Sequence, residues 1–126
     1  SRMNVVDSSA WLEYFADGSN AKMFAPAIEA TDELIVPTIC LYEVFKSVLR
    51  QRDESAALSA IALMRQGQVI PLTERIALLA ADLSLQTRLP MADSVILATA
   101  RVHRAHIWTQ DADFDGLDEV TFLAKQ

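Results

Sequence analysis

The stretch "MNVVDSSAWLEYF", Met3–Phe15, changes from strand-like to helix-like sequence within three residues. Its apolar start is followed by Asp7, Ser8 and Ser9, and then by apolar residues at helical spacing. Aspartate and serine are preferred at helix N-caps, so three such residues between two apolar segments mark a strand-to-helix turn. The stretch therefore predicts a β-strand that leads directly into an α-helix.

The rest of the chain repeats this alternation of short apolar runs and longer segments with helical spacing. Further strands are expected in residues 32–38, 68–72, 105–109 and 120–124, the last at a sheet edge. Further helices are expected in residues 20–31, 39–53, 54–67, 73–88 and 91–103. In the helix of residues 39–53, the predicted apolar face consists of Ile39, Tyr42, Phe45 and Leu49. We therefore predict a single α/β domain, residues 3–126, with a mostly parallel central sheet of four to five strands flanked by helices.

Composition restricts the classes of function. The chain has 126 residues, of which 52% are hydrophobic and 22% charged, as is typical of a soluble globular domain. No apolar run approaches the roughly 20 residues that span a membrane. With Cys40 expected to be a buried hydrophobe, this favours a cytoplasmic protein without membrane contact. The net charge of −6 disfavours broad nucleic-acid binding but suits carboxylates that hold cations. Ser1 and Arg2 precede Met3, which we expect to be the natural start.

Four acids occur where the predicted elements begin or end. Asp7 follows the first strand, and Glu43 lies near the start of the helix after the second. Asp93 lies at the start of the helix before the fourth strand, and Asp111 follows that strand. Ligand sites of parallel α/β sheets lie at the carboxyl ends of the strands, so these four segments can bring their acids together there.

Each acid also has a simpler explanation when it is considered alone. Asp7 and Asp93 can cap helices or lie favourably in the field of a helix N-terminus. Glu43 can be a solvated helix residue. The D-x-D-x-D run of residues 111–115 can be a polar turn, or part of a calcium loop. The calcium-loop template fails, because the run lacks the required spacing to a bidentate glutamate.

Considered together, the acids indicate a divalent cation. Several carboxylates in close proximity repel one another, so one of them takes up a proton unless a cation neutralises the group. Mg²⁺ or Mn²⁺ provides that cation, because both bind carboxylate oxygens and retain water ligands. Such a centre suits phosphodiester chemistry, in which the metal lowers the pKa of a bound water and stabilises the leaving oxygen. The residues alone thus predict an acidic metal site that acts on a phosphodiester.

Four segments carry a more specific signal when they are considered in order: "NVVDSSAWLEYF" (4–15), "VPTICLYEVFKSVL" (36–49), "LPMADSVILATA" (89–100) and "IWTQDADF" (107–114). In this order they resemble the PIN-domain family, and within it the VapC-type toxins of prokaryotic toxin–antitoxin pairs. The resemblance extends over essentially the whole chain from Met3. It implies a Mg²⁺-dependent endoribonuclease that forms homodimers. It also implies inhibition by a cognate antitoxin, whose C-terminal segment binds in a groove near the site.

The resemblance further implies roles for individual residues. The catalytic, metal-binding acids of the family match Asp7, Glu43, Asp93 and Asp111. The supporting residues are Ser8, Thr109 and Asp113. Of these, Thr109 supplies a hydroxyl that lines the site, and Ser8 positions Asp7 through its amide or hydroxyl. Asp113 either ligates the metal through water or caps the turn while Asp111 binds.

Basic residues near the acids suggest how an acidic protein binds RNA. Lys46 and Arg50 share one predicted helix face just after the second acid, and Arg101 and Arg104 lie beyond the helix of the third. We expect some of them to contact RNA phosphates, although solvated charges at helix ends are the simpler interpretation. The alternative function is a catalytically idle PIN-like module that works by binding proteins. The presence of all four acids disfavours this alternative.

Overall fold

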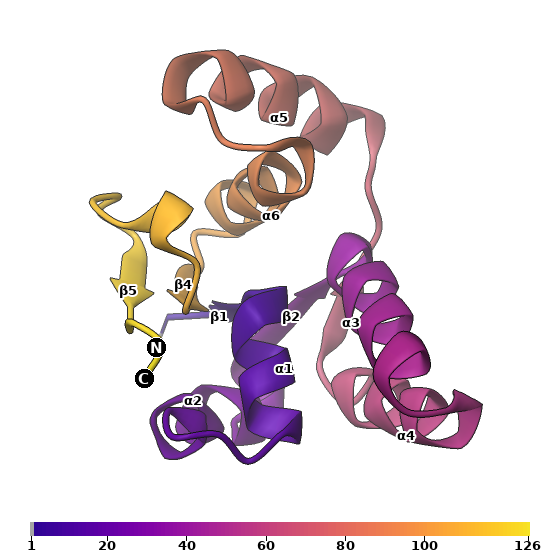
Figure 1. Ribbon diagram of the computed structural model, residues 1–126. Coiled ribbons are helices and arrows are strands. Elements are labelled where there is room, and N and C mark those ends of the chain that lie inside the picture. Colours follow the sequence, from indigo (N-terminus) through magenta and orange to yellow (C-terminus); the bar gives the residue numbers. More distant parts are fainter. Residues whose placement is uncertain (1) are drawn as a thin grey trace.

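The computed structural model describes residues 2–126 and contains a single five-stranded sheet with helices packed around it (Figure 1). The strands are β1 (Asn4–Val6), β2 (Leu34–Pro37), β3 (Gln68–Ile70), β4 (His106–Thr109) and β5 (Val120–Phe122). The α-helices are α1 (Ser8–Phe15), α2 (Ala21–Glu29), α3 (Thr38–Gln51), α4 (Glu54–Met64), α5 (Glu74–Thr87) and α6 (Met91–Val102). Two short 3₁₀ helices are η1 (Thr31–Glu33) and η2 (Ala112–Phe114).

The sheet has the strand order β3-β2-β1-β4-β5, and every neighbouring pair is parallel. β1 is the central strand, where Val5 pairs with Ile35 of β2 and with Ile107 of β4. The predicted α/β class and parallel central sheet are therefore confirmed. The predicted edge strand is β5, which ends at Phe122.

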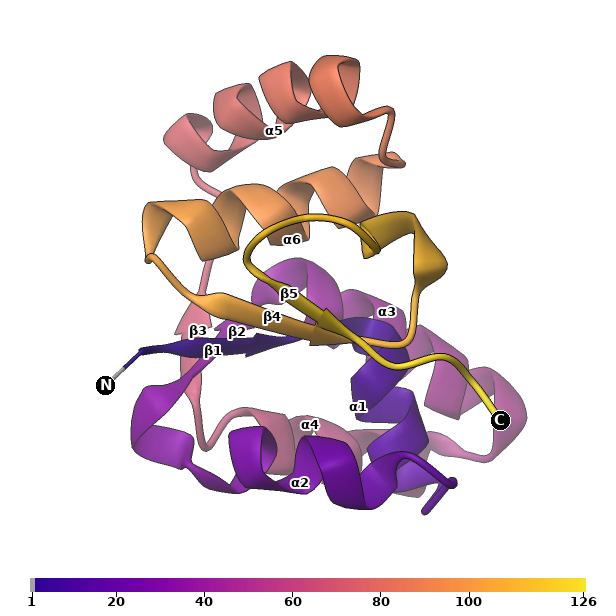
Figure 2. The same ribbon diagram turned by 90° about the vertical axis from the view of Figure 1, so that its left-hand side faces the viewer.

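Helices cover both faces of the sheet. Figure 2 shows α6 on one face, with α5 on the far side of α6, and α1, α2 and α4 on the opposite face. In this view the carboxyl ends of the strands all lie on the same side. α6 runs in the opposite direction, from the carboxyl ends of the strands back to their amino-terminal ends. The first turn of α6 and the ends of the strands consequently lie at the same edge. No helix among residues 2–126 is long and apolar enough to cross a membrane.

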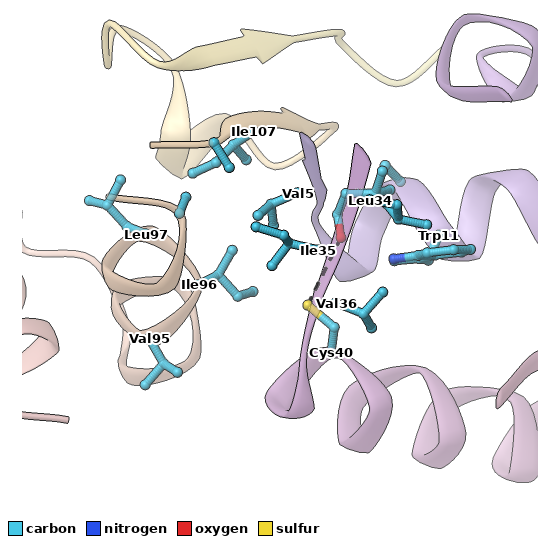
Figure 3. Close-up of a cluster of buried hydrophobic side chains, with 14 of the residues drawn as sticks. Val5, Trp11, Leu34, Ile35, Val36, Cys40, Val95, Ile96, Leu97 and Ile107 are labelled. Atoms are coloured by element: carbon cyan, nitrogen blue, oxygen red, sulfur yellow. Dashed lines mark hydrogen bonds between the residues drawn. The ribbon is translucent and has the colours of Figure 1, made fainter. Parts of the chain in front are cut away.

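The core lies between α6 and the sheet on one side and between the sheet and α1 on the other. Figure 3 shows Ile96 of α6 directed toward Val5 and Ile35, with Trp11 of α1 across the sheet. All four side chains are buried. Central parallel strands are buried on both faces, which explains why β1 and β2 are continuous apolar runs and not alternating ones. Cys40 is buried as predicted.

α3 buries a different face from the one that its apolar spacing predicts. Tyr42 and Leu49 are 59% and 43% exposed, whereas Cys40, Val44 and Ser47 are buried. The predicted face was therefore wrong at Tyr42 and Leu49, whereas Ile39 is partly buried against the core. The fully buried face is made of smaller side chains and packs against α1 and α4. Tyr42 remains on the outer face of α3, beside Glu43.

Candidate metal centre

Asp7 follows the last residue of β1 and is the N-cap of α1. Its backbone N–H donates to the carbonyl of Trp108 at 2.9 Å, which fixes it beside β4. Its Oδ2 accepts hydrogen bonds from Ser9 Oγ at 2.7 Å, Thr109 Oγ1 at 2.9 Å and Ser9 N at 3.3 Å. The side chain is only 2% exposed. Asp7 thus both caps α1 and presents a carboxylate at the carboxyl edge of the sheet.

Asp93 lies in the first turn of α6 and is 8% exposed. Pro90 is the N-cap of this helix, and no side chain caps it by a hydrogen bond. The capping explanation for Asp93 therefore does not hold. Carboxylate oxygens of Asp93, Asp111 and Asp113 all lie within 4.8 Å of one another, a spacing that suits shared coordination of one metal ion. The burial of Asp93 is thus explained by its place in this cluster and not by a role at the helix end.

Asp111 and Asp113 come from η2, directly after β4. Asp111 caps this turn, because its Oδ1 accepts a hydrogen bond from Asp113 N at 2.9 Å. The cap of the turn is thus Asp111 and not Asp113. The backbone N–H of Asp111 donates to Thr109 Oγ1 at 2.9 Å, so Thr109 lies between Asp111 and Asp7.

Glu43 lies in the second turn of α3 and its Oε1 accepts a hydrogen bond from Ser8 Oγ at 2.7 Å. The Ser8 hydroxyl is therefore directed to Glu43, and of the two serines it is Ser9 whose hydroxyl contacts Asp7. The sequence prediction had missed Ser9. The signal that identifies it is its place two residues after an N-cap aspartate, where the backbone N–H meets the cap.

The electrostatics of the centre oppose full ionisation. Burial raises the pKa of Asp93 to about 8, and the negative charges of Asp111, Asp7 and Glu43 add to this effect. Burial also raises the pKa of Asp7, against the opposing effect of its hydrogen bonds, and it raises the pKa of Glu43. Within residues 2–126, no lysine or arginine forms an ion pair with these acids. A donor set made only of carboxylates fits a hard divalent cation such as Mg²⁺ or Mn²⁺.

The basic residues of the sequence prediction fall into two separate groups. Lys46 and Arg50 lie on the outer face of α3, exposed and on the helix that carries Glu43. Arg101 and Arg104 lie at the other end of α6 from the acids, and Arg101 pairs with Glu119 at 2.8 Å. The distance along α6 from its first turn to Arg101 is roughly 12 Å, at about 1.5 Å per residue. Arg101 and Arg104 thus do not form a rim around the acids.

Fold and site together define a parallel α/β protein with a carboxylate-only centre at the carboxyl edge of its sheet. The family model for the PIN domain matches residues 5–120, and the chain belongs to this family. No curated protein matches the chain.

Three solved structures illustrate the similarity of fold. A toxin–antitoxin complex from Klebsiella pneumoniae matches with a TM-score of 0.81 at 24% identity, covering 98% of this chain and 99% of that one. VapC20 of Mycobacterium tuberculosis, described as a sarcin–ricin loop cleaving toxin, has a TM-score of 0.72 at 20% identity, with coverage of 93% and 98%. FitAcB from Neisseria gonorrhoeae has a TM-score of 0.73 at 16% identity, with coverage of 96% and 97%.

The raised pKa of Asp93 predicts a pH-dependent cost to stability in the metal-free protein. Asp93 ionises near pH 3.9 in an unfolded chain, but only near pH 8 in the folded protein. The folded state therefore holds a proton that the unfolded state has lost, and stability falls as the pH rises through this window. We expect Asp93→Asn to raise the Tm by roughly 4 °C or more near pH 8.5, with a smaller gain near pH 5. Thermal unfolding in chelator measures this, and a gain that does not change with pH would contradict it.

Proposed function

We propose that this PIN-domain protein is a VapC-type toxin, a Mg²⁺-dependent endoribonuclease that cleaves RNA phosphodiester bonds and is inhibited by a cognate antitoxin. The observation that carries the proposal is the approach of buried Asp93 to Asp111 and Asp113 without a cationic side chain to balance them. The related structures support the toxin class, because one is described as a toxin–antitoxin complex, another as a toxin, and a third as a member of the VapBC family of toxin–antitoxin systems.

Different residues of this chain would have different roles in such a centre. Asp93, Asp111 and Asp113, whose carboxylate oxygens lie within 4.8 Å of one another, would hold the cation. Asp7 and Glu43 lie outside this group and would complete the coordination from the starts of α1 and α3. When bound, Mg²⁺ or Mn²⁺ supplies a water of lowered pKa and stabilises charge on the leaving oxygen. Ser8 orients Glu43, and Thr109 orients Asp7.

We expect nuclease activity only when both the divalent cation and the acids of this centre are present. The protein should cleave structured RNA with Mg²⁺ or Mn²⁺ and should be inactive in chelator. Asp93→Asn should lower cleavage by about 100-fold or more, because even outer-shell partners of a metal are worth about 10–100-fold. Asp82→Asn, an exposed acid of α5, is the matched control.

Two results would contradict the proposal. Cleavage that survives both chelator and Asp93→Asn would exclude the metal mechanism. A folded parent protein that binds its antitoxin but cleaves no RNA would favour the alternative, an idle PIN-like binding module.

RNA binding is proposed for the outer face of α3. Lys46 Nζ lies 3.5 Å from the hydroxyl of Tyr42 and 5.6 Å from the centre of its ring. Tyr42 is largely exposed and immediately precedes Glu43, so its ring is available for stacking by an unpaired base. Lys46 and Arg50, on the same face, supply charge for the phosphates.

The two basic groups of the chain allow a matched test of RNA binding. Replacing Lys46 and Arg50 by Ala should weaken RNA binding and lower the slope of log Kobs against log salt by about 1–2. Replacing Arg101 and Arg104 by Ala removes the same charge at the other end of α6 and should have the smaller effect. Filter binding of a catalytically inactive form across a salt series measures both, and equal losses would contradict the assignment to α3.

An antitoxin segment is proposed to bind in the groove between α1, α3 and α4. This groove has a volume of about 430 Å³ and is lined by apolar residues that include Leu12, Phe15, Val48 and Leu63. α1 and α3 both begin where the acids lie, whereas the groove residues Phe15 and Val48 lie in the second halves of these helices. A bound segment that continues along the two helices toward their N-termini would bring a basic side chain into the metal centre. It would then inhibit by displacing the cation.

Two substitutions in α4, one inside the groove and one outside it, test the antitoxin proposal. Leu63→Glu in the groove should weaken binding of the cognate antitoxin by about 10-fold or more while Mg²⁺-dependent cleavage remains, since an apolar contact becomes a buried charge. Leu58→Glu, at an exposed position of the same helix, should bind normally. Full cleavage at a saturating concentration of antitoxin would contradict inhibition.

A homodimer is proposed through the hairpin of α5 and α6. Leu72, Leu78, Leu85 and Met91 are 49%, 65%, 85% and 73% exposed, an apolar group that a solvated helix pair does not require. We expect the protein to sediment as a dimer and Leu85→Glu to sediment as a monomer; a monomeric parent would contradict the proposal. The proposed RNA substrate and antitoxin imply a cytoplasmic location.

A further inference from the structure

The hydroxyl group of Ser9 connects the segments that follow β1 and β4. Its Oγ donates to Asp7 Oδ2 at 2.7 Å and accepts from the backbone N–H of Gln110 at 3.0 Å. An N–H group can only donate, so this contact uses a lone pair of Oγ and leaves the hydroxyl proton for the carboxylate. Ser9 Oγ also lies 3.3 Å from Thr109 Oγ1, but its contact with Asp7 Oδ2 is the shorter one and takes the proton.

Thr109 makes a second link with the same polarity. The backbone N–H of Asp111 donates to Thr109 Oγ1 at 2.9 Å, and this hydroxyl donates to Asp7 Oδ2 at 2.9 Å. Two consecutive peptide groups, at positions 110 and 111, are therefore each connected through one hydroxyl to the same carboxylate oxygen. Both links join Asp7 to the segment that carries Asp111.

The two oxygens of Asp7 consequently differ. Oδ2 accepts from two hydroxyls and from Ser9 N at 3.3 Å, which uses its hydrogen-bonding capacity. Oδ1 has no hydrogen-bond donor among the residues that the structure describes. A metal ion would therefore find one oxygen of Asp7, Oδ1, without a described donor, on a carboxylate whose other oxygen accepts three hydrogen bonds.

We propose that Ser9 is a positioning residue of the metal centre, which holds Asp7 as a one-oxygen ligand through Oδ1 and fixes its place relative to Asp111. This inference rests on the proposed metal function. This role would matter for the chemistry because an octahedral cation has few coordination positions. If Asp7 bound the cation through both oxygens, it would occupy a position that a water molecule needs. Ser9 keeps that position open.

Mn²⁺ binding to the RNA-free protein tests this role without reference to activity. Electron paramagnetic resonance counts free Mn²⁺ and gives its affinity. We expect Ser9→Ala to bind Mn²⁺ about 10-fold or more weakly, as is typical when an outer-shell partner is lost. Ser9→Thr retains the hydroxyl and should bind within about threefold of the parent. Thr99→Val is the matched control; it removes a buried hydroxyl of α6 that donates to the carbonyl of Val95 at 2.8 Å, six residues beyond Asp93.

The thermal stability of each variant without metal separates positioning from folding. If Ser9→Ala unfolds too easily to be titrated, Thr109→Val removes the parallel hydroxyl with little change of shape and should weaken Mn²⁺ binding similarly. Affinity of Ser9→Ala within twofold of the parent, in a folded protein, would overturn the inference. So would equal losses in Ser9→Ala and Ser9→Thr, because the hydroxyl would then not be the cause. A parent protein that binds no Mn²⁺ would instead refute the proposed metal function.

Discussion

Mutual repulsion among carboxylates at one edge of the sheet is the constraint on which the rest of this structure depends. Asp7 and Asp93 are almost completely removed from water, which weakens the screening of their charges. In the part of the chain that the structure describes, no basic side chain pairs with them. The remaining ways to balance the charge are hydrogen bonds, a proton or a cation. Hydrogen bonds are used at Asp7, and the raised pKa of Asp93, caused first by burial, favours a proton there in the absence of metal.

A repulsive cluster persists only if the backbone that carries it is held firmly, and α6 provides this. Every residue from Asp93 to Ala100 is buried, because the sheet covers one side of the helix and α5 covers another (Figure 2). A helix packed on all sides cannot move outward to relieve the repulsion at its first turn. This explains the position of α5, which covers α6 instead of the sheet. The apolar run after Asp93 thus fixes the carboxylate in place.

The sequence predicted those features that depend on local pattern. Alternating strands and helices predicted the parallel sheet, and the position of each acid at a strand or helix end predicted which edge it occupies. The separation of Arg101 from Asp93 also follows from the predicted helix of residues 91–103, in which the two lie two turns apart, so the suggestion that Arg101 lies beside the acids neglected helix length. Features that depend on side-chain rotation were not predictable from local pattern. Ser8 and Ser9 are adjacent and chemically identical, yet one contacts Glu43 and the other Asp7.

The helix N-termini near the acids bear on the role of Asp93. Asp7 caps α1, Asp111 caps η2, and Asp93 lies in the first turn of α6. The partial positive charge of a helix N-terminus stabilises a nearby anion by about 0.3–1 kcal/mol, and by up to about 2 kcal/mol when partly buried. The pKa of Asp93 is nevertheless raised to about 8, so this field does not balance burial and the neighbouring charges. A residue retained only to favour the helix would ionise readily there. The raised pKa of Asp93 indicates that its ionisation is opposed in the metal-free protein, and a divalent cation would favour that ionisation.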